Sequence, residues 1–296
     1  MFHWDDLRIF LAVARLQKVA VAARALGIDA TTVGRRVARL EQTLGAELFE
    51  MVGADRLLTS RGRALLGYAE SIESAALAAM EDATSSKQLL SGQVRLSVAE
   101  GFGTWLLAPG MADFSLRHPA IRLDLITASG FLNPSKREAD MAVMLGRPQR
   151  GRLQVRRLGN YHLHLYASPA YLDRAGIPSS TGALRRHTLI GYVPEFIFSP
   201  ELHYLDEVEA GLEAHLRSTS INMQHRMIAE GAGIGVLPDF IGRQDQSLVP
   251  IFADQVEITR SFWLVIHSDL RKLPRIEAVA DWLQQRVDVM SAAATA

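Results

Sequence analysis

Apolar residues recur at helical spacing in the first part of the chain. The earliest stripe has the spacing i, i+3, i+4, i+7 and consists of Leu7, Phe10, Leu11 and Ala14. Asp5 or Asp6 is expected to cap this helix, because a carboxylate accepts hydrogen bonds from the free N–H groups at a helix start. The stripe predicts a helix that covers the back of the segment that follows it.

Two short helices joined by a tight turn are predicted between Lys18 and Leu44. Gly27 is expected to end the first, since glycine tolerates the positive φ found just past a helix C-terminus, and Asp29 to offer a side-chain oxygen to the second. The second helix carries apolar residues at i, i+4, i+7 and i+11, namely Val33, Val37, Leu40 and Leu44. Its opposite face is polar. This arrangement predicts a helix-turn-helix, whose second helix can enter a DNA major groove.

Positive charge is concentrated in this segment, although the whole chain is neutral with 32 basic and 32 acidic residues. Between Arg15 and Arg39 there are six basic residues and one acid, Asp29. A local patch on a neutral chain favours a protein that reads specific DNA over one that coats DNA. The alternative is a solvated helical hairpin whose arginines are free or paired with Glu41 or Glu47.

The polar face of the second helix supplies most of the candidate DNA contacts. Thr31, Thr32 and Arg35 are expected at base edges, because arginine can bond guanine O6 and N7 together and a threonine methyl can touch thymine. Arg36 and Arg39 are expected at phosphates, which position the protein without specifying sequence. The full candidate set is Lys18, Thr31, Thr32, Arg35, Arg36, Arg39 and Arg56.

A small hairpin and a long helix are predicted next. Residues 51–59 place Gly53 between two short extended runs, which predicts a wing with Arg56 as its only cation. Residues 61–84 contain no proline and carry an apolar seam in alternating spacings of four and three, which predicts a dimerisation helix. The predicted seam consists of Leu65, Ala69, Ile72, Ala76 and Ala79. The alternative is a helix packed on its own domain.

From Gln93 onward, strands alternate with helices. Alternating or buried apolar runs at 94–98, 121–126 and 140–145 predict strands, and a helix is expected at 105–117. This alternation predicts a parallel, doubly wound α/β domain.

Composition and motifs exclude several kinds of chemistry. The chain has no cysteine, which excludes disulfides, thiolate catalysis and Cys-ligated zinc. No stretch approaches the roughly 20 apolar residues that span a bilayer, and the first residues do not read as a signal peptide. His162 and His164 share one face of a predicted strand, but with no third ligand in view a metal site is not predicted. No catalytic motif is found, so neither an enzyme nor a resident cofactor is expected.

Over nearly its full length the chain resembles the LysR-type transcriptional regulators. The N-terminal match comprises LRIFLAVA, VAARALGI, TTVGRRVARLEQTLGAELFE and LLTSRGRALL; the looser C-terminal match includes LLAPGMADFSLRHPAIRLDL, READMAVMLGRP and AEGAGIGVLP. The resemblance implies a winged helix-turn-helix, a long linker helix, and a periplasmic-binding-protein-like (type 2) effector domain of two α/β subdomains with a small ligand between them. It also implies a cytoplasmic homodimer or homotetramer that binds double-stranded promoter DNA and contacts RNA polymerase.

The resemblance also sets domain boundaries. Two crossover strands, expected at 160–167 and 261–267, join the subdomains. The predicted parts are a DNA-binding domain at 1–60, a linker helix and hinge at 61–92, and an effector domain at 93–296, with subdomain I at 93–160 and 266–296 and subdomain II at 161–265.

The effector cleft is expected where loops follow the strands of both subdomains. By the resemblance, its candidate residues are Ala99, Glu100, Gly101, Phe102, Ser129, Phe131, Pro194, Phe196, Ser218, Ser220 and Asn222. Helix starts near Phe102 and Asn222 favour an anion. Glu100, the phenylalanines of the set, and six acids without Lys or Arg between Glu195 and Glu213 favour an apolar or cationic ligand instead. The effector's identity stays open.

Replacement of either Arg35 or Arg36 by alanine is expected to lower operator affinity more than Arg56→Ala does. By the resemblance, relatives carry wing arginines where this chain has Met51, Ala54 and Leu57, so its wing is expected to supply less phosphate binding. Titration of an operator fragment with the three variants measures the ranking, and equal losses would contradict it.

Overall fold

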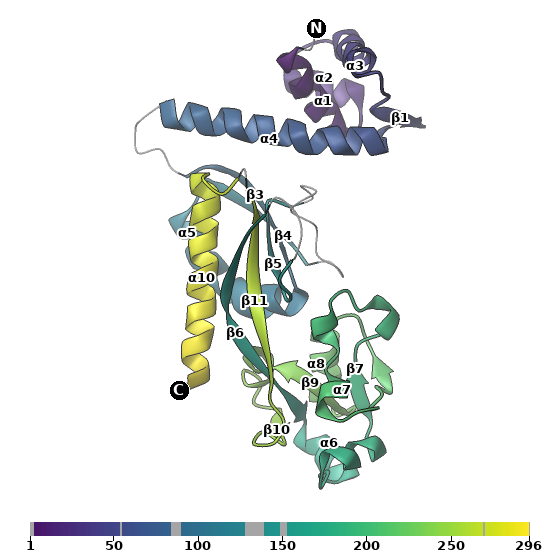
Figure 1. Ribbon diagram of the computed structural model, residues 1–296, viewed down its shortest axis with the longest axis vertical. Helices are drawn as coiled ribbons and strands as arrows, with labels where there is room; N and C mark the ends of the chain where they lie inside the picture. The colour runs from purple at the N-terminus through teal and green to yellow at the C-terminus, as the bar shows by residue number, and fades with distance from the viewer. Residues whose placement is uncertain are drawn as a thin grey trace. The chain divides into compact units, whose positions relative to one another are not determined.

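The computed structural model describes residues 3–53, 55–83, 90–127, 139–148, 153–268 and 270–295. The chain divides into two compact units, Met1–Gln88 and Leu89–Ala296 (Figure 1). The predicted helix-turn-helix and long helix belong to the first unit, and the predicted effector domain is the second. None of the helices in the described ranges combines the length and apolar character of a bilayer span.

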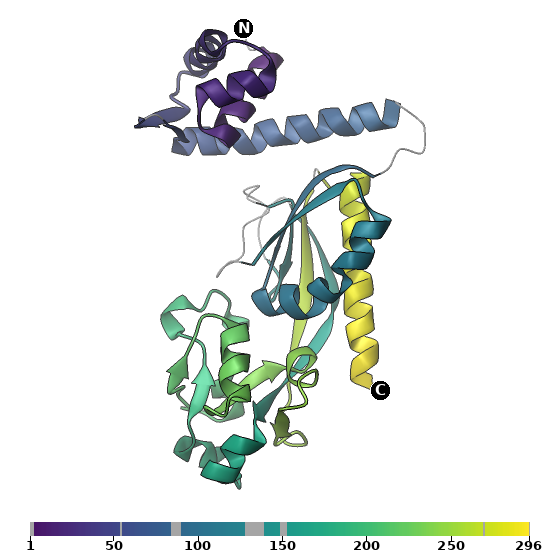
Figure 2. The same ribbon diagram turned by 180° about the vertical axis from the view of Figure 1, so that it is seen from behind.

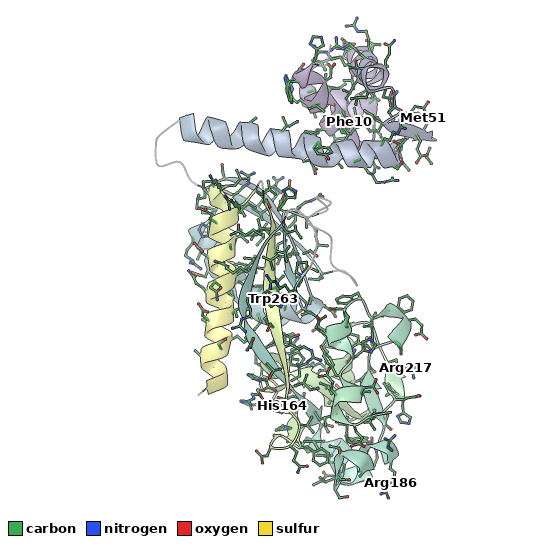
Figure 3. The ribbon with its side chains drawn as sticks, viewed as in Figure 1. Phe10, Met51, His164, Arg186, Arg217 and Trp263 are labelled. Atoms are coloured by element: carbon green, nitrogen blue, oxygen red, sulfur yellow. The ribbon has the colours of Figure 1, made fainter. Side chains whose placement is uncertain are left out.

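Three helices form the core of the first unit. They are α1 (Trp4–Leu16), α2 (Val19–Leu26) and α3 (Ala30–Leu44). Gly27 ends α2 with φ +67°, as its position predicts. Phe10, labelled in Figure 3, is fully buried, and its ring lies 5.3 Å from that of Phe49. The apolar residues that recur at helical spacing in α1 and α3 therefore pack into one core.

The helix starts differ in detail from the prediction. His3, and neither aspartate, occupies the N-cap position of α1. Asp29 is the N-cap of α3, but its carboxylate accepts from the hydroxyls of Thr31 (2.6 Å) and Thr32 (3.2 Å) and from no backbone N–H. Leu44, expected in the core, is 43% exposed, because it lies in the last turn of α3, beyond the packed part of the helix.

The predicted hairpin and long helix are present. The antiparallel strands β1 (Phe49–Val52) and β2 (Asp55–Leu58) precede α4 (Ser60–Ala83). Ala69 is buried in the core of the first unit, and Leu65 packs against the same core. The first turns of α4 are therefore part of the domain that precedes it.

Nine strands form one sheet within the ranges described for the second unit, in the order β4-β3-β5-β11-β6-β9-β7-β8, with β10 paired to β6. They are β3 (Gly92–Val98), β4 (Ile121–Ile126), β5 (Met141–Met144), β6 (Leu153–Ala167), β7 (Leu189–Gly191), β8 (Leu216–Arg217), β9 (Ile234–Pro238), β10 (Val249–Ile251) and β11 (Ile258–His267). Pairing is parallel between β3 and its neighbours β4 and β5, and between β7 and its neighbours β8 and β9.

The centre of the sheet corrects the prediction of a purely parallel domain. The crossover strands β6 and β11 are longer than expected and pair with each other in antiparallel fashion (Figures 1 and 2). β11 also pairs antiparallel with β5, and β6 with β9. The direction reverses because one strand leaves subdomain I and the other returns to it. The predicted subdomain boundaries fall inside these two strands.

Helices cover the sheet. They are α5 (Met111–Arg117), α6 (Pro169–Ala175), α7 (Leu205–Val208), α8 (Ile221–Ala229), α9 (Asp239–Gly242) and α10 (Pro274–Thr295). The single helix expected at 105–117 starts earlier, as a π-helix (Phe102–Leu107), continues as a 3₁₀ turn (Ala108–Gly110), and only then becomes α5. Trp282 of α10 is buried against the sheet, and its ring lies 4.7 Å from that of Phe114.

Two glycines of the first unit predict opposite effects of an added methyl group. A Cβ at Gly62 would lie 2.0 Å from the carbonyl oxygen of Leu48, which is backbone and cannot rotate away, so Gly62→Ala is expected to destabilise the unit by roughly 1–3 kcal/mol. A Cβ at Gly34 would meet nothing within 4 Å, so Gly34→Ala is expected to stabilise α3 by about 1 kcal/mol.

Hydrogen–deuterium exchange of the α1 to α3 amides in the full chain measures both effects, since the two units need not unfold together. Faster exchange is expected for Gly62→Ala and slower exchange for Gly34→Ala. Equal protection in the two variants would contradict the packing described here.

Candidate DNA-binding surface and effector cavity

The outer face of α3 carries an exposed arginine beside two ordered threonines. The hydrogen bonds of Thr31 and Thr32 to Asp29 hold both hydroxyls at the start of the helix and lower the pKa of that carboxyl. Arg35 is exposed and has no ion-pair partner in the part of the chain that the structure describes. Its guanidinium is therefore free to bind a partner from outside the domain.

Two further arginines of α3 are held by the start of α1. Arg39 forms a two-pronged pair with the buried carboxylate of Asp6, with Nε–Oδ2 at 2.9 Å and Nη2–Oδ1 at 2.6 Å. Arg36 bonds the carboxylate of Asp5, and its Nη1 lies 3.7 Å from Asp6 Oδ1. These contacts cross-link α1 and α3, and the hydrogen bond to Asp6 raises the pKa of Arg39.

The sequence suggested Glu41 or Glu47 as salt-bridge partners, which is wrong for Arg36 and Arg39. The carboxylate of Glu41 instead accepts from the backbone N–H groups of Leu48 (2.8 Å) and Phe49 (3.2 Å), where β1 begins. Glu41 therefore positions the wing.

The wing and the start of α2 carry the remaining DNA candidates. Lys18 Nζ lies 3.8 Å from Asp55 Oδ1 across the domain surface. Arg56 donates its backbone N–H to the carbonyl of Gln17 at 2.8 Å, which ties β2 to the end of α1. Met51, labelled in Figure 3, and Val52 are both exposed on β1. The hairpin thus presents apolar side chains beside a single arginine among its described residues.

The predicted seam of α4 divides into two parts. Leu65 and Ala69 are used inside the domain, as the alternative interpretation of this helix holds. Ile72 and Ala76 are exposed, and Tyr68, one turn before Ile72, is 68% exposed. The side chain of Ala79 lies outside the described residues. An interface on this helix would therefore use its later turns.

A cavity of about 130 Å³ lies between the two subdomains of the second unit. It is lined by Ala99, Glu100, Gly101, Phe102, Thr127, Leu145, Tyr161, Tyr192, Phe198, Leu202, Tyr204, Thr219, Ser220, Ile221, Pro238, Phe240, Ile241 and Phe262. Five of the predicted effector residues are in this set: Ala99, Glu100, Gly101, Phe102 and Ser220.

Four predicted residues lie elsewhere. Pro194 and Phe196 sit on an exposed turn, with Phe196 66% exposed. The Ser218 hydroxyl accepts from the backbone N–H of Ser220 at 3.1 Å. Asn222 bonds residues of the opposite subdomain. Ser129 and Phe131 lie outside the described residues.

Aromatic side chains from several segments were missed by the sequence analysis. Tyr161 stacks on Phe262 with ring centroids 4.2 Å apart, and Phe102 meets Phe262 at 4.7 Å. Tyr161 and Phe262 lie on the predicted crossovers, so the alternation of side chains along a strand that passes a cleft could have identified them. Phe198, Tyr204 and Phe240 come from turns and a short helix whose positions no local pattern reveals.

Direct contacts join the two subdomains beside the cavity. The Ser220 hydroxyl donates to Glu100 Oε1 at 3.0 Å. Trp105 Nε1 donates to Asn222 Oδ1 at 2.8 Å, and Asn222 Nδ2 donates to Thr104 Oγ1 at 3.0 Å. A Cβ at Gly101 would lie 3.1 Å from the side chain of Ile221. The subdomains are thus closed on each other at this edge.

The two histidines of β6 are used separately. His164, labelled in Figure 3, is buried with its Nδ1 2.7 Å from Asp239 Oδ1, which also accepts from the Tyr166 hydroxyl at 2.9 Å. His162 contacts Glu257 and Thr259. Across the described ranges, no three His, Cys, Asp or Glu side chains are grouped to hold a metal ion.

A larger cavity of about 590 Å³ lies against the last turns of α10. Its lining includes Leu106, Asn160, Arg243, Arg286 and Val289. It shares Tyr161 and Phe240 with the smaller cavity, so the two spaces are adjacent. Residues of both subdomains line each cavity, and the smaller one contains five of the predicted effector residues.

Comparison with known proteins gives the same two-part division. Residues 4–63 match the "Bacterial regulatory helix-turn-helix protein, lysR family" and residues 87–288 match the "LysR substrate binding domain". The chain is 30% identical over 280 residues to the Mau operon transcriptional activator of Paracoccus denitrificans, with 95% of each chain covered. It is 27% identical over 288 residues to the HTH-type transcriptional regulator CrgA of Neisseria meningitidis, with 96% of each covered.

Solved structures agree with these matches. The CrgA structure superposes with a TM-score of 0.61 at 27% identity and covers 96% of this chain and 99% of its own. ArgP from Mycobacterium tuberculosis gives a TM-score of 0.72 at 18% identity, with 97% of each chain covered, and supports the fold alone.

Gly34 allows a test of how closely the backbone of α3 approaches DNA. Since the methyl group of Gly34→Ala meets nothing in the free protein, any loss of DNA affinity must arise in the complex. We expect operator affinity to fall severalfold while helix stability rises. Titration of an operator fragment gives the affinity, and an unchanged value would leave weaker helix formation as the only effect of the glycine.

Proposed function

Since the chain belongs to the LysR-type transcriptional regulators, we propose how its particular residues bind DNA, assemble two copies and respond to a ligand. The protein is a DNA-binding transcriptional regulator with a helix-turn-helix unit and an effector-binding unit. The family matches over both units carry this conclusion.

We propose that Arg35, Thr31 and Thr32 read base edges. Arg35 is exposed without an ion-pair partner among the described residues, and the two hydroxyls are ordered beside it. Arg36 and Arg39 are proposed as phosphate contacts that the pairs with Asp5 and Asp6 hold in place. Lys18 and Arg56 extend the same surface.

We propose that two copies associate through the later turns of α4, where Ile72 and Ala76 are exposed. A dimer can place two recognition helices in half-sites one helical turn apart. A monomer, with so few cations to bind phosphates, would have a lower affinity for DNA. Assembly to a tetramer, contact with RNA polymerase and a cytoplasmic location are further expectations. No catalytic activity and no resident cofactor are proposed.

We propose that the effector binds in the cavity between the subdomains and changes their closure. The hydrogen bond from Ser220 to Glu100 and those of Asn222 to Trp105 and Thr104 join the two walls of the cleft. A ligand that favours one arrangement of the walls shifts the population toward it.

Replacement of Ile72 by glutamate is expected to abolish operator binding without altering any proposed DNA contact. A charge on the exposed later part of α4 would have to be desolvated at the interface, so the dimer should be lost. Sedimentation velocity measures the oligomeric state, and an operator titration measures the affinity.

Ala64→Glu is the matched control, because it adds the same charge to an exposed position in the first turns of the same helix. It should keep both assembly and binding. The proposal as a whole is tested by footprinting the protein on its own upstream region. Absence of any protected site at moderate salt would count against a sequence-specific regulator.

A further inference from the structure

We infer that the cavity between the subdomains takes a small organic ammonium ion, namely a protonated monoamine with one aromatic ring. This inference rests on the proposed function in one respect, namely that this cavity is the effector site.

The charge of the cavity wall favours a cation. Among the described lining residues Glu100 is the only one with a formal charge, and none is Lys, Arg or His. Its carboxylate accepts from the Ser220 hydroxyl at 3.0 Å and has no ion-pair partner in the described ranges. A bound carboxylate would therefore add like charge to a partly enclosed space, whereas an ammonium would neutralise the charge of Glu100.

A cation behind the wall, Arg260, is already paired. Arg260 lies with its guanidinium carbon 6.0 Å from the ring centroid of Tyr204. It bonds the carboxylate of Glu207, and its Nε donates to the carbonyl of Glu201 at 3.0 Å. Because these contacts use its charge outside the cavity, Arg260 does not compensate Glu100.

Seven aromatic rings from the described ranges line the same cavity. They belong to Phe102, Tyr161, Tyr192, Phe198, Tyr204, Phe240 and Phe262. The faces of such rings attract cations, most strongly where water is excluded. A carboxylate surrounded by rings therefore provides both an ion-pair partner and a cation–π environment for one positive group.

The tyrosines also offer free acceptors. No hydroxyl partner is found for Tyr161, Tyr192 or Tyr204 among the residues that the structure describes, although buried phenols normally have one. Burial raises the pKa of all three, so they remain neutral phenols whose oxygens can accept. An ammonium has donors and no acceptors, which matches a wall with a carboxylate and free phenol oxygens.

The volume limits the ligand to about one ring. The cavity measures about 130 Å³. An apolar protein cavity of about 150 Å³ is known to hold one benzene molecule. A ligand with one ring, such as benzylammonium, is therefore at the upper limit of this partly open cavity, and a sugar or nucleotide does not fit without opening of the cleft.

The position of Glu100 connects this ligand to closure. Ser220, which bonds Glu100, is also the N-cap of α8, where its Oγ accepts from the Met223 N–H at 3.0 Å. An ammonium bound to Glu100 acts on the one carboxylate among the described lining residues, and this carboxylate links the two walls of the cavity. The same group thus recognises the ligand and joins the subdomains.

Isothermal titration of the full chain with benzylamine, benzyl alcohol and benzoate tests the inference, because the three probes share a ring and differ in charge. Benzylamine should bind at least tenfold more tightly than either of the others. Glu100→Gln should weaken benzylamine by at least tenfold and leave benzyl alcohol within about threefold. Glu213→Gln is the matched control, since its side chain is 86% exposed and does not line the cavity.

Tyr192→Phe keeps the ring, removes one hydroxyl and should weaken benzylamine severalfold, which provides a second variant if Glu100→Gln folds poorly. Tighter binding of benzoate, equal binding of benzyl alcohol, or no binding of benzylamine would each overturn the inference. None of these outcomes affects the operator footprint of the ligand-free protein, so the proposed regulator stands or fails separately.

Discussion

The antiparallel pairing of β6 and β11 is the constraint on which the effector unit depends. Their ladder runs from Ile258 opposite Leu163 to His267 opposite Leu153, and no other described strand spans the same length of the sheet. Backbone hydrogen bonds therefore fix how the two parallel half-sheets meet. Tyr161 and Phe262, which stack in the cavity, are carried by these strands, so the ligand site is built directly on the connection between the subdomains.

Local patterns in the sequence were sufficient for most elements. The period of 3.6 residues identified α1, α3 and α4, glycine at positive φ marked the end of α2, and alternation identified β4 and the wing. These features depend on neighbours a few residues away. The π-helical start at Phe102 and the antiparallel centre of the sheet were not predicted, because each depends on packing between segments far apart in the chain.

In the candidate sites, too, local patterns predicted some features, while others depend on packing between distant segments. The exposed face of α3 followed from its helical period, but the pairing of Arg39 with Asp6 depends on how α1 and α3 are rotated against each other, across 33 positions of sequence. Glu100 and Ser220 were predicted through the resemblance to the family, which places them in loops that line the cleft. The tyrosines opposite them were not, because Tyr161, Tyr192 and Tyr204 come from three separate segments that only the folded sheet brings together.

The pairs between α1 and α3 also bear on the response of DNA binding to ionic strength. Each unpaired cation that meets a phosphate releases condensed counterions, which makes binding weaken steeply as salt rises. Arg36 and Arg39 share their charge with Asp5 and Asp6 before DNA arrives, so fewer counterions are released than the number of arginines suggests. A larger fraction of the affinity then comes from contacts that salt does not screen, and recognition by this domain is correspondingly less sensitive to the ionic strength of its surroundings.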